Sequence, residues 1–391
     1  MSSLFKRAMA KAADLTRAGH LAEATAAIQR ALSQRAEPAD APADGDVIEG
    51  VFTRLDDETP RPRTPKADRR RQASAASRSA LSETLRRIAA GGMPGGTTPS
   101  RSEPPIPAAA KFLSLTHTSP QGTIAYRLYI PAKRLATPMP LILMLHGCTQ
   151  SPEDFAAGTG MNSLAEEFGC LVAYPAQPHG ANAQKCWNWY RPQDQKRGRG
   201  EPALLAGMVQ EILLDHGADP ARVYVAGLSA GGAAAAILAA AYPEIFSAVG
   251  IHSGLPLAAA QDVASAFAAM RSGAGKGAEA IPVPTIIFHG QADVTVHPKN
   301  GDALLAQAVH GHSGLRQTHQ SGASPGGRTV HQTRFLRADG SSLAEFWQVE
   351  GAGHAWAGGH PAGSYTDARG PDASREMLRF FLQHNAPTRN V

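Results

Sequence analysis

Ser229 is the residue whose neighbours most clearly indicate chemistry. It lies in the motif Gly-Leu-Ser-Ala-Gly at 227–231, which follows the apolar residues 223–226 and precedes a helix-like stretch at 231–241. A tight strand-to-helix turn holds a serine hydroxyl at the carboxyl end of a sheet, and the helix N-terminus favours developing negative charge there. Glycines at both ends of the motif leave room for the turn. We therefore predict that Ser229 is a nucleophile.

A serine nucleophile needs a base, and the base needs a carboxylate to orient it. Asp293 is the first carboxylate after the predicted strand 285–288, and His354 lies in a glycine-rich loop after the predicted strand 345–349. The chain order of serine, aspartate and histidine is the order found in α/β-hydrolases. We predict that Asp293 orients His354 and that His354 is the general base.

The sequence also offers weaker candidates for these roles. His252 and His289 end predicted strands and are expected to be structural histidines. His297 is close to Asp293 and either forms a local hydrogen bond or faces solvent. Asp302 competes with Asp293, but it falls inside the next predicted helix.

The oxyanion of an acyl-transfer reaction needs two backbone N–H groups that point to one position. The amide of Ala230 follows the nucleophile directly. The second donor is expected in the loop after the apolar strand 141–145, where Gly147 permits a sharp turn, and Cys148 is our candidate. No cofactor is required for this chemistry.

Tryptophans cluster near these motifs, although aromatic residues make up only 6% of the chain. Trp187 and Trp189 lie in a loop-like segment, and Trp356 follows His354 closely. We expect them to form an apolar wall that binds substrate. The alternative is that they fill the core beneath the loop. Glu201 opens a predicted helix, where we expect it to cap or pair rather than catalyse.

The elements that must position these residues alternate between strand and helix from about residue 111 onward. Residues 112–117 and 123–131 read as an antiparallel hairpin, and later short apolar runs read as buried parallel strands. We predict helices at 161–168, 204–214, 231–241 and 301–309, and a helical insertion within 258–280. This pattern predicts an α/β fold with a mostly parallel sheet and helices on both faces.

The first 110 residues have a different character. Residues 1–35 read as a helical segment, and residues 36–110 are rich in Pro, Ala, Ser and Arg, which predicts a largely disordered linker before a domain at 111–391. The first 110 residues carry 17 Lys and Arg against 13 Asp and Glu, so they hold most of the net charge of +5. The rest is nearly neutral, which argues against nucleic acid as a partner.

The cysteines, the apolar runs and the N-terminus indicate the compartment of the protein and whether it binds a metal. The three cysteines exclude a disulfide-dense scaffold, and none forms a Cys-x-x-Cys pair, so no metal site is expected. No apolar run is long enough for a transmembrane segment, and charged residues interrupt the N-terminus where a secretory signal would be apolar. We expect a cytoplasmic protein.

Several motifs together resemble the esterase family that includes poly(3-hydroxybutyrate) depolymerases and is related to feruloyl and acetylxylan esterases. They are His-Gly-Cys-Thr-Gln at 146–150, Cys-Trp-Asn-Trp at 186–189, Gly-Glu-Pro at 200–202, Gly-Leu-Ser-Ala-Gly at 227–231 and Gly-His-Ala-Trp at 353–356. The resemblance implies an α/β-hydrolase fold, a cofactor-free triad of Ser229, Asp293 and His354, and an oxyanion donor at Cys148. It also raises the alternative of an extracellular enzyme, with Cys148 and Cys186 either free or paired.

The function predicted on these grounds is hydrolysis of poly(3-hydroxybutyrate) or its oligomers. A feruloyl or acetylxylan esterase is the alternative among enzymes, and a granule-associated binding protein is the alternative outside them. The chain resembles the intracellular-type members of the family, so the N-terminal segment is a candidate for contact with a polymer granule.

Overall fold

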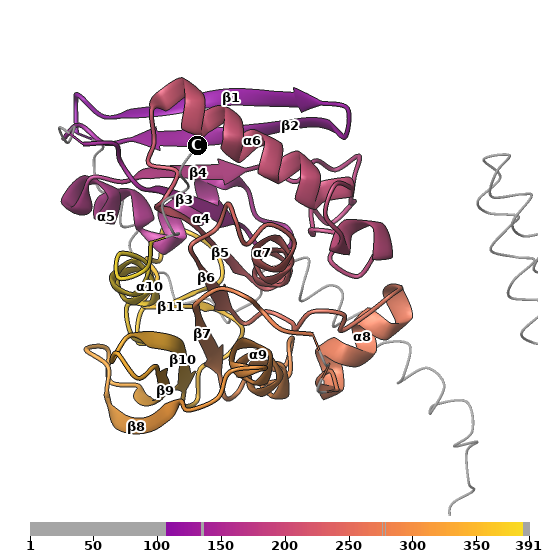
Figure 1. The fold of residues 1–391 in the computed structure, drawn as a ribbon, viewed down its shortest axis with the longest axis vertical. Coiled ribbons are helices and arrows are strands. Elements are labelled where there is room, and N and C mark those ends of the chain that lie inside the picture. Colours follow the sequence, from indigo (N-terminus) through magenta and orange to yellow (C-terminus); the bar gives the residue numbers. More distant parts are fainter. Residues whose placement is uncertain (1–106, 134–136, 276, 278, 386–391) are drawn as a thin grey trace, which may run out of the picture. The chain divides into compact units, whose positions relative to one another are not determined.

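The computed structural model describes residues 107–133, 137–275, 277 and 279–385 (Figure 1). The predicted helical segment 1–35 and nearly all of the predicted linker 36–110 lie outside these residues, so both stay predictions. The expected domain boundary near residue 111 also remains a prediction.

The described residues form a ten-stranded sheet in the order β1-β2-β4-β3-β5-β6-β7-β10-β9-β8 (Figure 1). Its strands are β1 (Lys111–Ser119), β2 (Gly122–Ile130), β3 (Leu141–Leu145), β4 (Leu171–Pro175), β5 (Val223–Leu228), β6 (Ala248–His252), β7 (Thr285–Gly290), β8 (Arg316–Ala323), β9 (Thr329–Leu336) and β10 (Ser342–Val349). The helices are α4 (Pro152–Thr159), α5 (Met161–Phe168), α6 (Gly200–His216), α7 (Ala230–Ala241), α8 (Val263–Ser272), α9 (Lys299–Val309) and α10 (Ala373–Phe381). A short 3-10 helix, η1 (Pro192–Gln195), and a pair of two-residue strands, β11 (Trp356–Ala357) and β12 (Thr366–Asp367), complete the described elements.

The centre of the sheet is parallel and both ends are antiparallel. Strands β4, β3, β5, β6, β7 and β10 pair in parallel, as predicted. The predicted hairpin β1–β2 pairs antiparallel and joins the sheet through β4. At the other end, β9 pairs antiparallel to β10 and β8 pairs antiparallel to β9, which the sequence did not indicate. Strand β8 is almost wholly exposed and polar, so it lacks the apolar alternation that identifies a strand.

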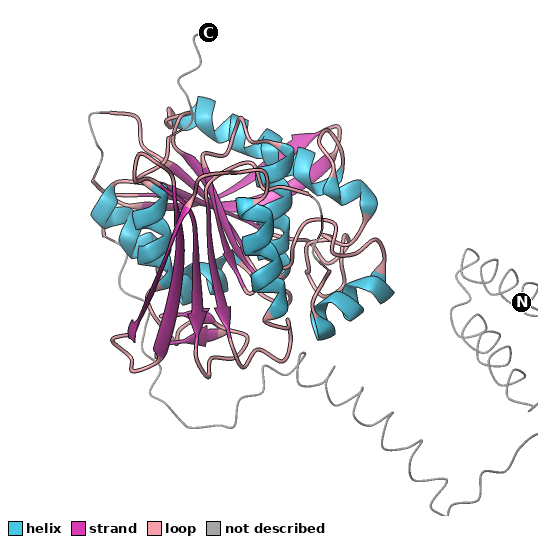
Figure 2. Ribbon diagram, turned by 60° about the horizontal axis from the view of Figure 1, so that its bottom comes forward, coloured by secondary structure: helices cyan, strands magenta, loops and turns pink. Residues whose placement is uncertain are grey.

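Alternate residues of the central strands face two separate cores. In β3, Leu141, Leu143 and Leu145 join one apolar cluster, whereas Ile142 and Met144 join the other. Helices α6, α7, α8 and α9 contribute to the first cluster, and α4, α5 and α10 to the second. Figure 2 shows helices on both sides of the strands, which confirms the predicted layering.

Helix α7 is built almost entirely from alanine and glycine, and ten of its residues are buried. Small side chains let its backbone lie close to the sheet. A Cβ atom added at Gly231 would lie 2.1 Å from the carbonyl oxygen of Leu145, at the end of strand β3. The composition of α7 therefore holds its N-terminus against the sheet.

The carboxyl ends of the parallel strands lie at one edge of the sheet, and the polar residues identified in the sequence analysis lie at this edge. His146 follows β3, Ser229 follows β5, and His252 ends β6. Asp293 and His354 lie in the turns after β7 and β10. The fold thus brings residues that are more than 200 positions apart in the sequence to the same edge of the sheet.

Candidate active site

Ser229 occupies a strained turn between β5 and α7. Its backbone has φ 59° and ψ −119°, a conformation that side-chain-bearing residues rarely adopt. The turn is held because the Ser229 amide donates to the carbonyl of His252 at 2.9 Å and the Ser229 carbonyl accepts from the Ala233 amide at 3.0 Å. The residue is 8% exposed. This geometry fits the turn predicted for a nucleophile.

The two glycines of the motif are required by close backbone contacts. A Cβ atom at Gly227 would lie 2.3 Å from the carbonyl of Gly231, and one at Gly231 would strike the carbonyl oxygens of Leu145 and His146. Only glycine fits at either position without moving the backbone. The prediction that both glycines make room for the turn is therefore confirmed.

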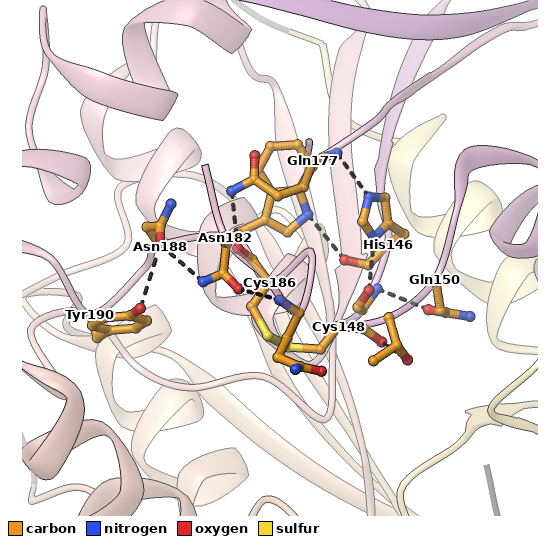
Figure 3. The surroundings of a disulfide bond; sticks show 12 residues. His146, Cys148, Gln150, Gln177, Asn182, Cys186, Asn188 and Tyr190 are labelled. Atoms are coloured by element: carbon orange, nitrogen blue, oxygen red, sulfur yellow. Dashed lines mark hydrogen bonds between the residues drawn. A yellow bond between two sulfur atoms is a disulfide. The ribbon is translucent and has the colours of Figure 1, made fainter. Parts of the chain in front are cut away.

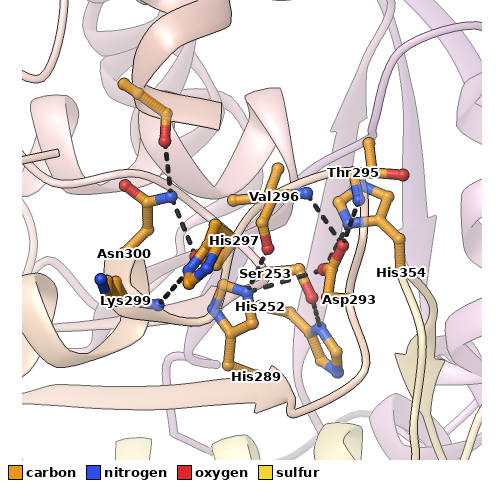
Figure 4. Close-up of polar contacts among 11 residues, drawn as sticks. His252, Ser253, His289, Asp293, Thr295, Val296, His297, Lys299, Asn300 and His354 are labelled. Carbon is orange, nitrogen blue, oxygen red and sulfur yellow. Dashed lines mark hydrogen bonds and ion pairs between the residues drawn. The ribbon is translucent and has the colours of Figure 1, made fainter. Parts of the chain in front are cut away.

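Asp293 and His354 are joined as the sequence predicted. The Nδ1–H of His354 donates to Oδ2 of Asp293 at 2.7 Å (Figure 4). The other carboxylate oxygen, Oδ1, accepts from the backbone amides of Thr295 at 2.9 Å and Val296 at 2.8 Å. With Nδ1 protonated and engaged, Nε2 of the neutral imidazole carries the lone pair that a general base needs.

The electrostatics of the pair favour an ionised carboxylate. Burial by itself would raise the pKa of Asp293, but the hydrogen bond and charge of His354, together with His289 and the Val296 amide, outweigh it and hold that pKa below its usual value. Nε2 of buried His289 lies 3.6 Å from Oδ2 of Asp293 and donates to the carbonyl of Val296 at 2.8 Å. His289 thus supports the turn that carries the carboxylate.

The other candidates do not join this pair. Asp302 is exposed in the first turn of α9, and Nδ1 of His297 accepts from the Lys299 amide at 3.2 Å, which is the local contact considered for it. Among the described residues, no hydrogen bond joins Ser229 to His354. Such bonds are often long in enzymes without substrate and shorten when substrate binds.

The backbone amides of Cys148 and Ala230, the two predicted oxyanion donors, lie in the loop after β3 and at the start of α7. In the part of the chain that the structure describes, the N–H groups of Cys148 and Ala230 donate to no protein acceptor. Ala230 is the first residue of α7, where an unpaired amide is normal. The amide of Cys148 belongs to the predicted oxyanion loop, 146–150. These two amides are the oxyanion donors predicted from the sequence.

Several other backbone groups of that loop form hydrogen bonds (Figure 3). The indole of Trp187 donates to the carbonyl of His146 at 3.0 Å. The ring of His146 donates from Nδ1 to the carbonyl of Gly147 at 2.7 Å and accepts at Nε2 from the Gln177 amide at 3.1 Å. Oε1 of Gln150 accepts from the Gly147 amide at 2.9 Å. Burial lowers the pKa of His146 to about 4, so its ring stays neutral and keeps both bonds.

A disulfide joins Cys148 to Cys186, the pairing that the sequence left open. It ties the oxyanion loop to the segment 186–190 (Figure 3). The amide of Thr149 also donates to the carbonyl of Gln184 at 2.7 Å. The residue proposed to supply an oxyanion donor is therefore covalently fixed to its neighbouring loop.

Glu201 holds the segment 186–190 in place through hydrogen bonds. Its carboxylate accepts from the Asn188 amide at 2.8 Å, from Nδ2 of Asn188 at 2.5 Å and from Nε2 of Gln177 at 2.5 Å. Burial raises the pKa of Glu201 to about 7 despite these bonds. These contacts agree with the pairing expected for Glu201, and its absence from catalysis stays a prediction.

The expected exposure of the tryptophans is wrong. Trp187, Trp189 and Trp356 are only 0%, 6% and 1% exposed. Trp187 binds a backbone carbonyl, and the Trp356 indole donates to the Ser374 hydroxyl at 3.0 Å, so both polar groups are satisfied inside the protein. Trp189 packs edge-on against Tyr190. Sequence alone could not show which way rings on a loop would turn, and the alternative of core filling is the one observed.

No group of three or more potential metal ligands occurs among residues 107–133, 137–275, 277 and 279–385. Within the same residues, no helix is both long enough and apolar enough to cross a membrane.

A family model described as esterase PHB depolymerase matches residues 124–333. The chain belongs to this family. It is 34% identical over 264 residues to poly(3-hydroxyalkanoate) depolymerase C of Paucimonas lemoignei, covering 63% of each chain. It is also 30% identical over 274 residues to feruloyl esterase B of Neurospora crassa, covering 65% of this chain and 86% of that protein.

A third relative is the probable acetylxylan esterase A of Neosartorya fischeri, 29% identical over 204 residues, or 47% of this chain and 54% of that protein. The chain thus spans less than two thirds of both the depolymerase and the acetylxylan esterase. The solved structure of an acetyl xylan esterase from Aspergillus awamori superposes with a TM-score of 0.54 at 19% identity, covering 70% of this chain and 99% of that one. This likeness supports the α/β-hydrolase fold.

Proposed function

We propose that this protein is a serine carboxylic-ester hydrolase. The observation that carries the proposal is the bond between Nδ1 of His354 and the buried, ionised Asp293, at the same sheet edge as the strained Ser229. That bond fixes the imidazole tautomer whose Nε2 can accept a proton. Family membership and the names of the relatives support the same reaction class.

The reaction proceeds in two halves. Nε2 of His354 takes the proton of the Ser229 hydroxyl as Oγ bonds to the ester carbonyl carbon, and the amides of Cys148 and Ala230 stabilise the oxyanion. The intermediate collapses, the ester C–O bond breaks, and His354 gives the proton to the leaving alcohol. Water, activated by the same imidazole, then hydrolyses the acyl-enzyme to free acid and restores Ser229.

The proposed substrate is poly(3-hydroxybutyrate) or its short oligomers. Similarity to a protein named poly(3-hydroxyalkanoate) depolymerase C supports this choice, and similarity to proteins named feruloyl and acetylxylan esterase keeps sugar esters as the alternative. Contact of the N-terminal segment with a polymer granule, expected for an intracellular member of the family, stays a separate prediction, and that segment lies outside the described residues.

We further propose that the protein is located in an oxidising compartment rather than in the cytoplasm. The disulfide between Cys148 and Cys186 supports this change, because structural disulfides persist mainly in secreted and extracellular proteins.

The first experiment compares Ser229→Ala with the unaltered protein on amorphous poly(3-hydroxybutyrate) granules, a feruloyl ester and a nitrophenyl butyrate. We expect the variant to lose at least about a thousandfold in kcat on every ester that the protein cleaves. Ser321→Ala, on the exposed strand β8, is the matched control and should keep full activity.

The outcome separates the candidate functions. Granule hydrolysis that depends on Ser229 supports the depolymerase, whereas hydrolysis of the feruloyl ester alone supports the carbohydrate esterase. If the protein sediments with the granules but hydrolyses none of the esters, the hypothesis of an enzyme fails and that of a granule-binding protein is favoured.

A further inference from the structure

His252 occupies a position between the proposed nucleophile and the proposed base. It is the last residue of β6, which lies between β5 and β7 in the sheet. Its carbonyl oxygen accepts the Ser229 amide at 2.9 Å, and this bond helps hold the strained turn. The backbone of His252 is thus already part of the structure that presents Ser229.

The ring of His252 makes a second connection, to the segment that follows His354. Nε2 accepts the backbone amide of Ala357 at 2.9 Å, and Nδ1 lies 3.1 Å from the Ser253 hydroxyl. Figure 4 shows His252 close to Asp293 and His354. Because Nε2 accepts, the proton is on Nδ1, where the serine hydroxyl can receive it.

The surroundings keep this ring neutral and fixed in orientation. It is 1% exposed and stacks between Phe288, at 5.8 Å and 9°, and Trp356, at 5.0 Å and 25°. Burial lowers the pKa of His252 to about 3, so the Nε2 lone pair is available throughout the neutral range. Trp356, expected from the sequence to bind substrate, instead holds this ring in place.

One residue therefore contacts both sides of the proposed catalytic centre. Ala357 lies three residues after His354, and the chain between them is also held at Trp356, whose amide donates to the carbonyl of Tyr365 and whose indole donates to the Ser374 hydroxyl. The Ala357–His252 bond links this segment to the central sheet beside Ser229.

We propose that His252 is a positioning residue that sets the distance and orientation of His354 relative to Ser229. It touches no reacting atom, so it acts through the His354 loop and the Ser229 turn. The inference rests on the proposed ester hydrolysis. A purely structural role would affect the stability of the protein and leave kcat per folded active site unchanged.

The test uses two variants of the full chain that differ only in where they place an amide. In His252→Gln the amide reaches the position of Nε2 and can still accept from Ala357. In His252→Asn it reaches only the position of Nδ1. We measure kcat and KM for nitrophenyl butyrate, with active sites counted by a stoichiometric phosphate ester and folding checked by thermal unfolding.

We expect His252→Asn to lower kcat by roughly ten- to a hundredfold with KM changed by less than about twofold, since small misplacements of catalytic groups have effects of this size. His252→Gln should recover most of that loss. His252→Phe, which keeps a stacked ring but has no acceptor, replaces His252→Asn if that variant does not fold. His319→Asn, on the exposed strand β8, controls for the type of substitution and should leave kcat unchanged.

Wild-type kcat in His252→Asn, or an equal loss in the glutamine and asparagine variants, would overturn the inference. Ser229→Ala, assayed beside them, keeps the two proposals distinguishable. If Ser229→Ala is inactive and His252→Asn is normal, only the positioning role fails. If Ser229→Ala retains activity, the proposed hydrolysis itself fails.

Discussion

The two regions beside Ser229 are held in place by different means. On the oxyanion side, the loop at 146–150 is fixed by a disulfide, an indole N–H and a neutral histidine, and a buried carboxylate supports the adjoining loop. On the base side, Asp293 and His354 are positioned by hydrogen bonds and by two buried histidines, with no covalent link among the described residues.

This difference predicts different sensitivities. The oxyanion side should respond to reduction of the disulfide and to ionisation of Glu201. The base side should respond to the charge of Asp293 and be indifferent to a reductant.

The largest effect is expected from Asp293→Asn. The amide cannot hold the His354 tautomer or stabilise the imidazolium, so kcat for nitrophenyl butyrate should fall roughly 10³–10⁴-fold with little loss of folding. Asp302→Asn, at an exposed position in α9, is the matched control. A loss of less than tenfold would show that Asp293 does not orient the base.

A smaller effect is expected from removing the disulfide by Cys148→Ala with Cys186→Ala. The Cys148 amide is kept but less well held, so kcat should fall about tenfold, which is below the cost of losing an oxyanion donor outright. The crosslink spans 38 residues, so the free energy of unfolding should fall by about 3–4 kcal/mol.

Treatment of the unaltered protein with dithiothreitol should reproduce both changes and should have no effect on the double variant. The pH dependence of kcat/KM should keep its shape, because the Asp293–His354 pair lies on the other side. A change of shape would mean that the two regions are not independent.

The smallest effect concerns Glu201 and appears in stability rather than in rate. Its folded pKa of about 7 exceeds the ordinary value of 4.5, so between these values the unfolded chain binds fewer protons than the folded one. Its contribution to stability is therefore largest below about pH 4.5 and declines as pH rises to about 7, by on the order of 2–3 kcal/mol.

Urea unfolding of the unaltered protein and of Glu201→Gln at pH 5 and pH 8 checks this expectation. The pH dependence should be shallower in the variant. Glu153→Gln, whose side chain is largely exposed, should leave the slope as it was. Identical slopes in all three proteins would mean that Glu201 is ionised across the whole range.

The features that could be predicted from the sequence are those that residues adjacent in the chain determine. The apolar strand, small flanking residues and following helix around Ser229 specify a turn locally, and chain order selects Asp293 and His354. The same applies to buried strands such as β3, whose five residues are all apolar and all buried.

Features that depend on contacts between distant segments could not be predicted in this way. The direction of the Trp187 ring depends on the carbonyl of His146, 41 positions earlier. The role of His252 depends on an amide 105 positions later. Helices α4 and α10 and strands β8 and β9 were missed as well. Strand β8 is polar along nearly its whole length, and in the described sheet it pairs only with β9.

Helix α7 limits how this protein can diverge or be engineered. Its buried alanines and glycines leave no space for larger side chains behind Ser229, so a protein library that varied this helix would yield mostly unfolded or inactive members. New substrate preferences would have to arise in the loops at the carboxyl edge of the sheet. Diversity can accumulate there while the helix and the turn it supports stay constant.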